Sequence, residues 1–90
     1  MSKVKLQRLL TERLKLRKPI FRLERIGNKL AGSVISETFK SKSSRRRQEM
    51  IWDVLDDELG PVESIRQVGT LLTYSPAEWN IDLPTAASAR

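Results

Sequence analysis

Cationic and hydroxyl side chains cluster between residues 40 and 47, in the run Lys-Ser-Lys-Ser-Ser-Arg-Arg-Arg, just before a segment with helical periodicity. Lysine and arginine form charge-assisted hydrogen bonds with phosphate oxygens, and the free N–H groups at a helix start add further donors. The pattern therefore predicts an anion or phosphate site. The residues predicted to form it are Lys40, Ser41, Lys42, Ser43, Arg45, Arg46 and Arg47.

The charges of the predicted helix, residues 44–59, run against its dipole. Three arginines occupy its first turn, whereas Asp53, Asp56, Asp57 and Glu58 lie toward its end. Each such placement is unfavourable by roughly 0.3–1 kcal/mol at an exposed site. Two interpretations follow: a solvated charge run, relieved in part by an Arg45–Glu49 pair one turn apart, or a helix start that binds an external anion.

The amino-acid composition limits which catalytic and metal-binding sites the chain could form. The chain has 90 residues, which is one small domain, and it contains neither cysteine nor histidine. Those two residue types supply most protein metal ligands, nucleophiles and acid–base groups near neutral pH. We therefore expect no metal, no cofactor and no enzymatic activity.

The net charge of +6 is divided unevenly along the chain. Residues 1–48 hold 15 Lys and Arg against 3 Asp and Glu, whereas residues 49–90 hold 2 against 8. A half this basic favours a polyanionic partner such as nucleic acid. The alternative is that the basic half neutralises the acidic half within the molecule.

The elements that would position these residues begin with a basic amphipathic helix over residues 3–16, with Leu6, Leu10 and Leu14 on one face. We expect this face to pack on a sheet; a membrane-surface role for residues 3–18 is the alternative. No apolar run approaches the length of a membrane span, and no signal peptide is apparent, so we expect a cytoplasmic protein.

Three strands are predicted. Residues 20–26 and 29–39 form a hairpin around the Gly27-Asn28 turn, and residues 65–74 form the third strand. Gly32, in mid-strand, suggests a bulge or a close contact. The expected fold is α+β, a single α-β-β-α-β domain whose three-stranded mixed sheet has helices packed on one face.

The second helix has recognisable ends. Ser43 or Ser44 is the expected N-cap, and Gly60-Pro61 ends the helix. Trp52 falls off its apolar stripe, which indicates a residue that stacks on a base or anchors a partner protein, or one that covers the helix edge against the sheet. A capping box follows at Ser75, Pro76 and Glu78. We place the domain at residues 1–79 and expect residues 80–90 to form a flexible tail.

The chain resembles the BolA-like family, whose fold is like that of type II KH domains. The resemblance covers residues 34–79. It is carried by Val34-Ile35-Ser36-Glu37 followed by Phe39, by the loop 40–43, by Arg47, and by residues 73–79, Thr-Tyr-Ser-Pro-Ala-Glu-Trp. It implies DNA binding and transcriptional regulation through the loop and the helix start, where the charge pattern also points.

The sequence departs from that family at its iron–sulfur ligands. Gln48 occupies the place of the family's ligating histidine, and the first hairpin lacks the second His or Cys ligand. We therefore expect no cluster sharing with a monothiol glutaredoxin, although a cluster-free contact with one remains an alternative. The KH-type GXXG loop is also missing, so contacts would go to phosphates and carry little sequence information.

Two functions are thus predicted. The first is a nucleic-acid-binding regulatory module, DNA being the expected target. The second is a protein-interaction or assembly module that has lost cluster ligation and uses Trp52, the acidic helix end and the sheet edge.

Overall fold

The computed structural model describes residues 1–80. Its elements are α1 (Lys3–Leu14), β1 (Ile20–Ile26), β2 (Lys29–Ile35), the 3-10 turn η1 (Glu37–Phe39), α2 (Ser44–Leu59), α3 (Pro61–Gln67) and β3 (Val68–Tyr74). A last helical turn covers residues 76–80. No helix in this part of the chain is long and apolar enough to cross a membrane.

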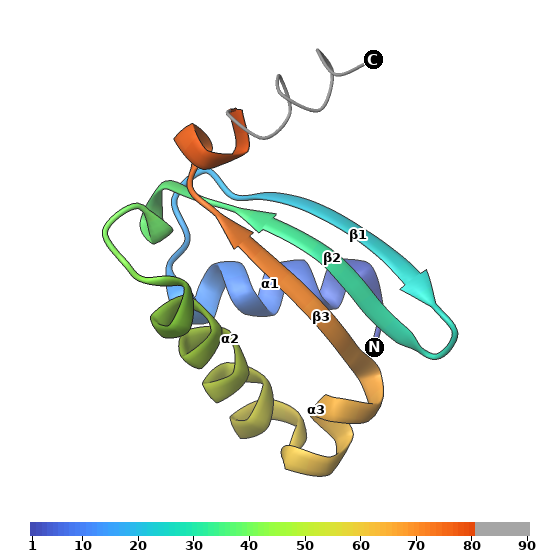
Figure 1. The fold of residues 1–90 in the computed structure, drawn as a ribbon. Coiled ribbons are helices and arrows are strands. Elements are labelled where there is room, and N and C mark those ends of the chain that lie inside the picture. The colour runs from blue at the N-terminus through green and yellow to red at the C-terminus, as the bar shows by residue number, and fades with distance from the viewer. Residues whose placement is uncertain (81–90) are drawn as a thin grey trace.

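The sheet has the strand order β1-β2-β3 (Figure 1). β1 and β2 are antiparallel around the Gly27-Asn28 turn, and β3 joins β2 in parallel after the crossover through η1, α2 and α3. This confirms the predicted α+β fold with a three-stranded mixed sheet. The crossover matters for the site because it places the loop 40–43 and the start of α2 at one end of the sheet (Figure 1).

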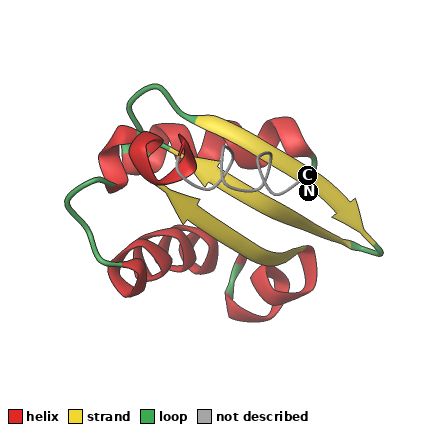
Figure 2. Ribbon diagram, turned by 45° about the horizontal axis from the view of Figure 1, so that its top comes forward, coloured by secondary structure: helices red, strands yellow, loops and turns green. Residues whose placement is uncertain are grey.

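The core lies between the sheet and the long helices, and α1 crosses behind the sheet in Figure 2. The predicted leucine stripe of α1 supplies Leu6 and Leu10, both fully buried. The other core side chains are Leu16, Leu30, Val34, Phe39, Ile51, Val54, Leu55, Val68 and Leu71. The fully buried Phe39 therefore anchors the chain in the core immediately before the basic loop.

The predicted irregularity at Gly32 is confirmed. The β2–β3 register shifts between Leu30 and Gly32, and Gly32 has φ +144°. A Cβ atom there would lie 1.9 Å from the carbonyl oxygen of Arg22 on β1. Glycine is thus required both by the backbone angle and by the close approach of the neighbouring strand.

Two predicted boundaries were too long. α1 ends at Leu14, because Lys15 takes a left-handed conformation with φ 52° and its N–H bonds Thr11 O. β2 ends at Ile35 instead of residue 39, because the Ser36 hydroxyl accepts a hydrogen bond from Thr38 N–H and caps the η1 turn. A side chain that offers the backbone a local partner competes with strand pairing at that point.

The prediction of a strand from residue 65 was also wrong, since residues 61–67 form α3. Pro61, read as the stop of α2, sits in the first turn of this new helix, where its missing N–H has no consequence. Ser64 Oγ donates to Asp56 Oδ1 at 2.6 Å and holds α3 against α2. Ile65, which looked like a strand residue, is an exposed helical side chain.

The predicted capping box is confirmed. Ser75 N–H donates to Glu78 Oε1 at 2.6 Å, and Glu78 N–H donates to Ser75 Oγ at 3.4 Å. Trp79 meets Tyr74 edge-on at 5.2 Å between ring centroids, and the Arg22 guanidinium carbon lies 5.9 Å from the centroid of the Trp79 ring. The turn includes Asn80, the first residue of the predicted tail; the remainder of that tail, residues 81–90, lies outside the described residues.

Candidate polyanion-binding site

The start of α2 presents two arginines to solvent. Ser43 is the N-cap, as predicted: its Oγ accepts from Arg46 N–H at 3.1 Å. The side chains of Arg45 and Arg46 are 90% and 58% exposed. Both lie near Glu49, at 3.7 and 3.5 Å, so the predicted Arg45–Glu49 pair is confirmed, and one carboxylate serves two guanidinium groups.

The loop before α2 adds two more cations. Lys40 and Ser41 are exposed, and Lys42 is half-buried. Within residues 1–80 neither lysine makes an ion pair. The loop and the first turn of α2 thus carry Lys40, Lys42, Arg45 and Arg46 close together along the chain, on either side of the capping residue Ser43.

The structure corrects the prediction for Arg47. This arginine was grouped with the phosphate-contacting residues, but its side chain is only 5% exposed. Its Nε donates to Lys42 O at 2.9 Å, and its Nη1 donates to Thr73 O at 3.3 Å. Its guanidinium carbon also lies 5.8 Å from the centre of the Phe39 ring. One residue beyond Arg46 on a helix turns a side chain about 100°, so Arg47 faces the interior and stabilises the loop instead of reaching solvent.

The partner of Arg47 is the capping-box carboxylate. Glu78 accepts from Nη1 at 2.7 Å and from Nη2 at 3.3 Å, a two-point contact. The bonds from the Arg47 guanidinium and from the Ser75 backbone N–H lower the pKa of Glu78 from 4.5 to about 2. Glu78 stood out in the sequence only as a capping residue; nothing in the local pattern signalled its second role.

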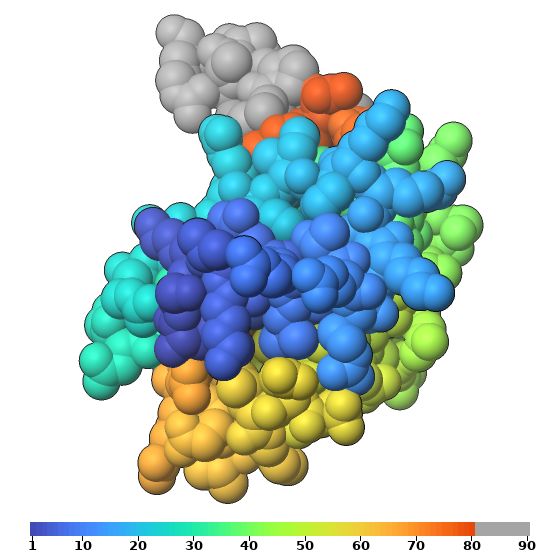
Figure 3. Space-filling view, turned by 180° about the vertical axis from the view of Figure 1, so that it is seen from behind, coloured from blue at the N-terminus to red at the C-terminus, as the bar shows by residue number. Residues whose placement is uncertain are grey.

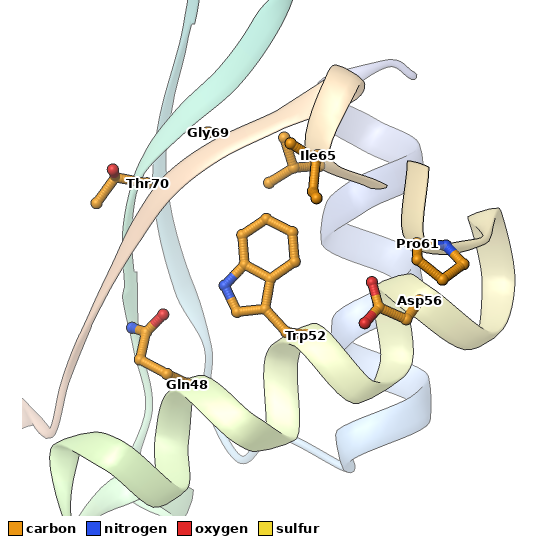
Figure 4. A pocket seen from close by; sticks show the side chains of 8 residues that line it. Gln48, Trp52, Asp56, Pro61, Ile65, Gly69 and Thr70 are labelled. Atoms are coloured by element: carbon orange, nitrogen blue, oxygen red, sulfur yellow. The ribbon is translucent and has the colours of Figure 1, made fainter. Parts of the chain in front are cut away.

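Trp52 lies in a separate groove between α2, α3 and the outer edge of β3 (Figure 4). The indole is partly buried against the core, so it covers the helix edge, as one of the two interpretations held. The groove measures about 530 Å³, and its lining includes Trp52, Ile65, Gln48 and Asp56. Its rim combines an exposed apolar side chain, Ile65, with an acidic one, Asp56.

Gln48, which the sequence resemblance matches to the family's histidine ligand, is hydrogen-bonded to the sheet. Its Nε2 donates to Leu71 O at 2.7 Å. The Arg47 side chain donates to Thr73 O in the same way, so two carbonyl oxygens of β3 accept hydrogen bonds from side chains of α2. The side chains of α2 thereby occupy part of the strand edge that was predicted as a partner-contact surface.

Comparisons with solved structures show the fold. The chain is similar to a BolA protein homologue from Coxiella burnetii, with a TM-score of 0.66 and 17% identity over 89% of this chain and 97% of that one. It is also similar to the BolA domain of SufE1 from Arabidopsis thaliana (TM-score 0.61, 19% identity, 87% and 98% covered). A third similar structure is a Bol-like protein from Babesia bovis (0.59, 17%, 91% and 93%).

No protein-family model matches the sequence, and no curated protein matches it. At identities below 20%, the three structures establish that the fold is BolA-like, as the sequence resemblance implied. Fold alone does not carry function, which has to be argued from the residues of the site.

Proposed function

We propose that this protein is a non-catalytic module that binds nucleic acid through its phosphate backbone, with a regulatory role. The observation that carries the proposal is the group of cations at the loop–α2 junction: the exposed Lys40, Arg45 and Arg46 and the half-buried Lys42. Two of them lie on the first turn of a helix, where the dipole disfavours cations and favours an external anion. A phosphate placed there would relieve that unfavourable arrangement.

The form of nucleic acid we propose is a duplex, and DNA is the expected kind. Proteins that bind single strands without sequence preference stack bases on exposed aromatic rings. Residues 40–47 contain no aromatic residue, and Phe39, which immediately precedes them, is fully buried. Cations, hydroxyls and backbone N–H groups contact phosphates instead, so binding should depend strongly on salt and weakly on sequence.

The test is fluorescence anisotropy of labelled duplex DNA, titrated with the protein at several salt concentrations. R45A/R46A removes two exposed cations from the junction. K3A/K5A removes the same charge from the exposed start of α1, where neither lysine is ion-paired within residues 1–80. We expect R45A/R46A, unlike the control, to weaken binding and to lower the salt slope by about 2. Absence of duplex binding by the wild-type protein, or equal losses in both variants, would refute the proposal.

A second candidate is a protein-interaction module, and the Trp52 groove is the observation that favours it. The groove combines a partly buried indole with the exposed Ile65 and an acidic rim, a composition suited to an apolar, basic segment of a partner. The BolA domain of SufE1 supports this candidate, since there the fold occurs as a domain of another protein. A monothiol glutaredoxin is the partner we would test first.

The two tryptophans of the chain allow a direct measurement. In a W79F background, Trp52 is the only tryptophan, and binding over the groove should change its emission. We would titrate a purified monothiol glutaredoxin that lacks tryptophan, with I65A as a groove variant and V62A as a control for an exposed α3 residue that does not line the groove. An unchanged spectrum at saturating glutaredoxin would exclude this partner from the groove.

A further inference from the structure

The segment between α1 and β1 carries a second group of cations, Lys15, Arg17 and Lys18, all exposed. None of the three makes an ion pair within residues 1–80. Lys15 and Lys18 both have positive φ, 52° and 47°. Such angles are uncommon outside glycine and asparagine, so the segment is held in its shape by its surroundings.

What holds this segment is a pair of hydrogen bonds with Ser36, the residue between β2 and η1, and with Thr38 of η1. Ser36, which is fully buried, donates through Oγ to Arg17 O at 2.8 Å. Arg17 N–H in turn donates to Thr38 Oγ1 at 2.9 Å. These bonds dock residues 15–18 beside the turn that leads directly into Lys40, although the two segments are about twenty residues apart in the sequence.

The space-filling view from behind shows this neighbourhood: the light-blue chain after α1 lies next to the green chain before and at the start of α2 (Figure 3). The two segments therefore lie side by side, and between them they carry seven cations: Lys15, Arg17, Lys18, Lys40, Lys42, Arg45 and Arg46. The η1 turn also carries one carboxylate, Glu37, and Glu49 is shared by Arg45 and Arg46.

We propose that residues 15–18 are a second phosphate-contacting arm, so that the site takes a polyanion long enough to span both segments. This rests on the proposed function and extends it from a single helix start to a two-part surface. Lysines and arginines from both segments would meet successive phosphates of one nucleic-acid backbone, so more phosphate contacts form than at the helix start alone. Buried Ser36 acts as the positioning residue that keeps the arms together.

Further support comes from the ion pairs of Arg13, the last cation of α1. Arg13 Nη2 lies 2.8 Å from Asp57 Oδ2 and Arg13 Nη1 lies 3.6 Å from Glu58 Oε2, so these two carboxylates of α2 pair with α1. Within residues 1–80 no ion pair joins them to residues 15–18. The intramolecular alternative for the basic half therefore holds for Arg13 but not for the three cations that follow it.

The experiment is the same duplex titration with K15N/R17A/K18N. Asparagine tolerates positive φ, so the two backbone positions are not strained further. The matched control is K3A/K5A/K29A, which removes three exposed cations from elsewhere, none of them ion-paired within residues 1–80. Thermal unfolding of both variants checks that each is folded.

We expect K15N/R17A/K18N to bind roughly tenfold or more weakly than the control and to lower the salt slope by about 2 to 3. If it binds like the control while R45A/R46A is impaired, the second arm is refuted and the helix-start site stands. If the wild-type protein binds no duplex, both proposals fall. S36A removes the hydroxyl that donates to Arg17 O and accepts from Thr38 N–H. It should weaken duplex binding only if residues 15–18 and the loop–α2 junction contact the same duplex.

Discussion

Arg47 and Glu78, 31 residues apart, form a two-point ion pair in which the arginine is buried and the glutamate is 48% exposed. The same guanidinium bonds Lys42 O and Thr73 O. One side chain therefore links three parts of the molecule: the basic loop, the end of β3 and the last helical turn. Because Lys42 belongs to the proposed site, the pair also positions the loop that would contact phosphate.

The first prediction concerns pH. The pKa of Glu78 falls from 4.5 to about 2 on folding, so its charged form stabilises the protein fully above about pH 4.5. That stabilisation is lost as the pH falls from 4.5 toward 2. In E78Q it is absent at every pH. The difference in the free energy of unfolding between wild type and E78Q, measured by urea denaturation, should be largest near pH 6 and shrink toward pH 2. A difference independent of pH would contradict the assignment.

The second prediction is that Arg47 contributes more to the free energy of unfolding than its exposed neighbour Arg45. R47M keeps the aliphatic stem but leaves Lys42 O and Thr73 O without their donor. It should lower the free energy of unfolding by roughly 2–3 kcal/mol, since hydrogen bonds from a charged group contribute about 1.5–3 kcal/mol. R45M, at an exposed position with only a 3.7 Å ion pair, should change it by about 0.5 kcal/mol or less. Equal effects in urea denaturation would show that Arg47 is not buried as described.

The third prediction tests the bulge in β2. G32A must accommodate a Cβ where Arg22 O now lies, at a φ that favours glycine. We expect a loss of roughly 2–4 kcal/mol in the free energy of unfolding. G69A on β3 is the control, because its Cβ would meet its nearest neighbours at an ordinary 3.7 Å. Thermal melts of the two variants should therefore differ by many degrees; similar melting temperatures would be incompatible with the bulge geometry.

The fourth prediction concerns the cap of α2. S43A removes the acceptor of Arg46 N–H and should destabilise the protein by about 1 kcal/mol. Ser44, the other cap candidate in the sequence, lies within the helix, where alanine is favoured, so S44A should be neutral or slightly stabilising. A reversed order of the two melting temperatures would move the helix start by one residue.

Features with a local physical origin could be predicted from the sequence. The hairpin turn at Gly27-Asn28, the cap at Ser43 and the capping box of Ser75 and Glu78 each depend on residues within four positions of one another. α3 was missed because Ile65 and its neighbours have strand-like composition. The helix is favoured by a hydrogen bond between two helices, from Ser64 of α3 to Asp56 of α2. Strand propensities of single residues cannot anticipate such a contact.

For this protein the sequence alone determined the α+β plan, the basic character of its first half and the concentration of cations around residues 40–47. Only the tertiary structure decided which of those cations face solvent. It turned Arg47 inward to Glu78, set Gln48 against β3, and used Ser36 to bring Arg17 beside the basic loop. The reason is physical: caps and turns are satisfied by nearby backbone, whereas partners 19 or more residues away are chosen only when packing of the core brings their elements together.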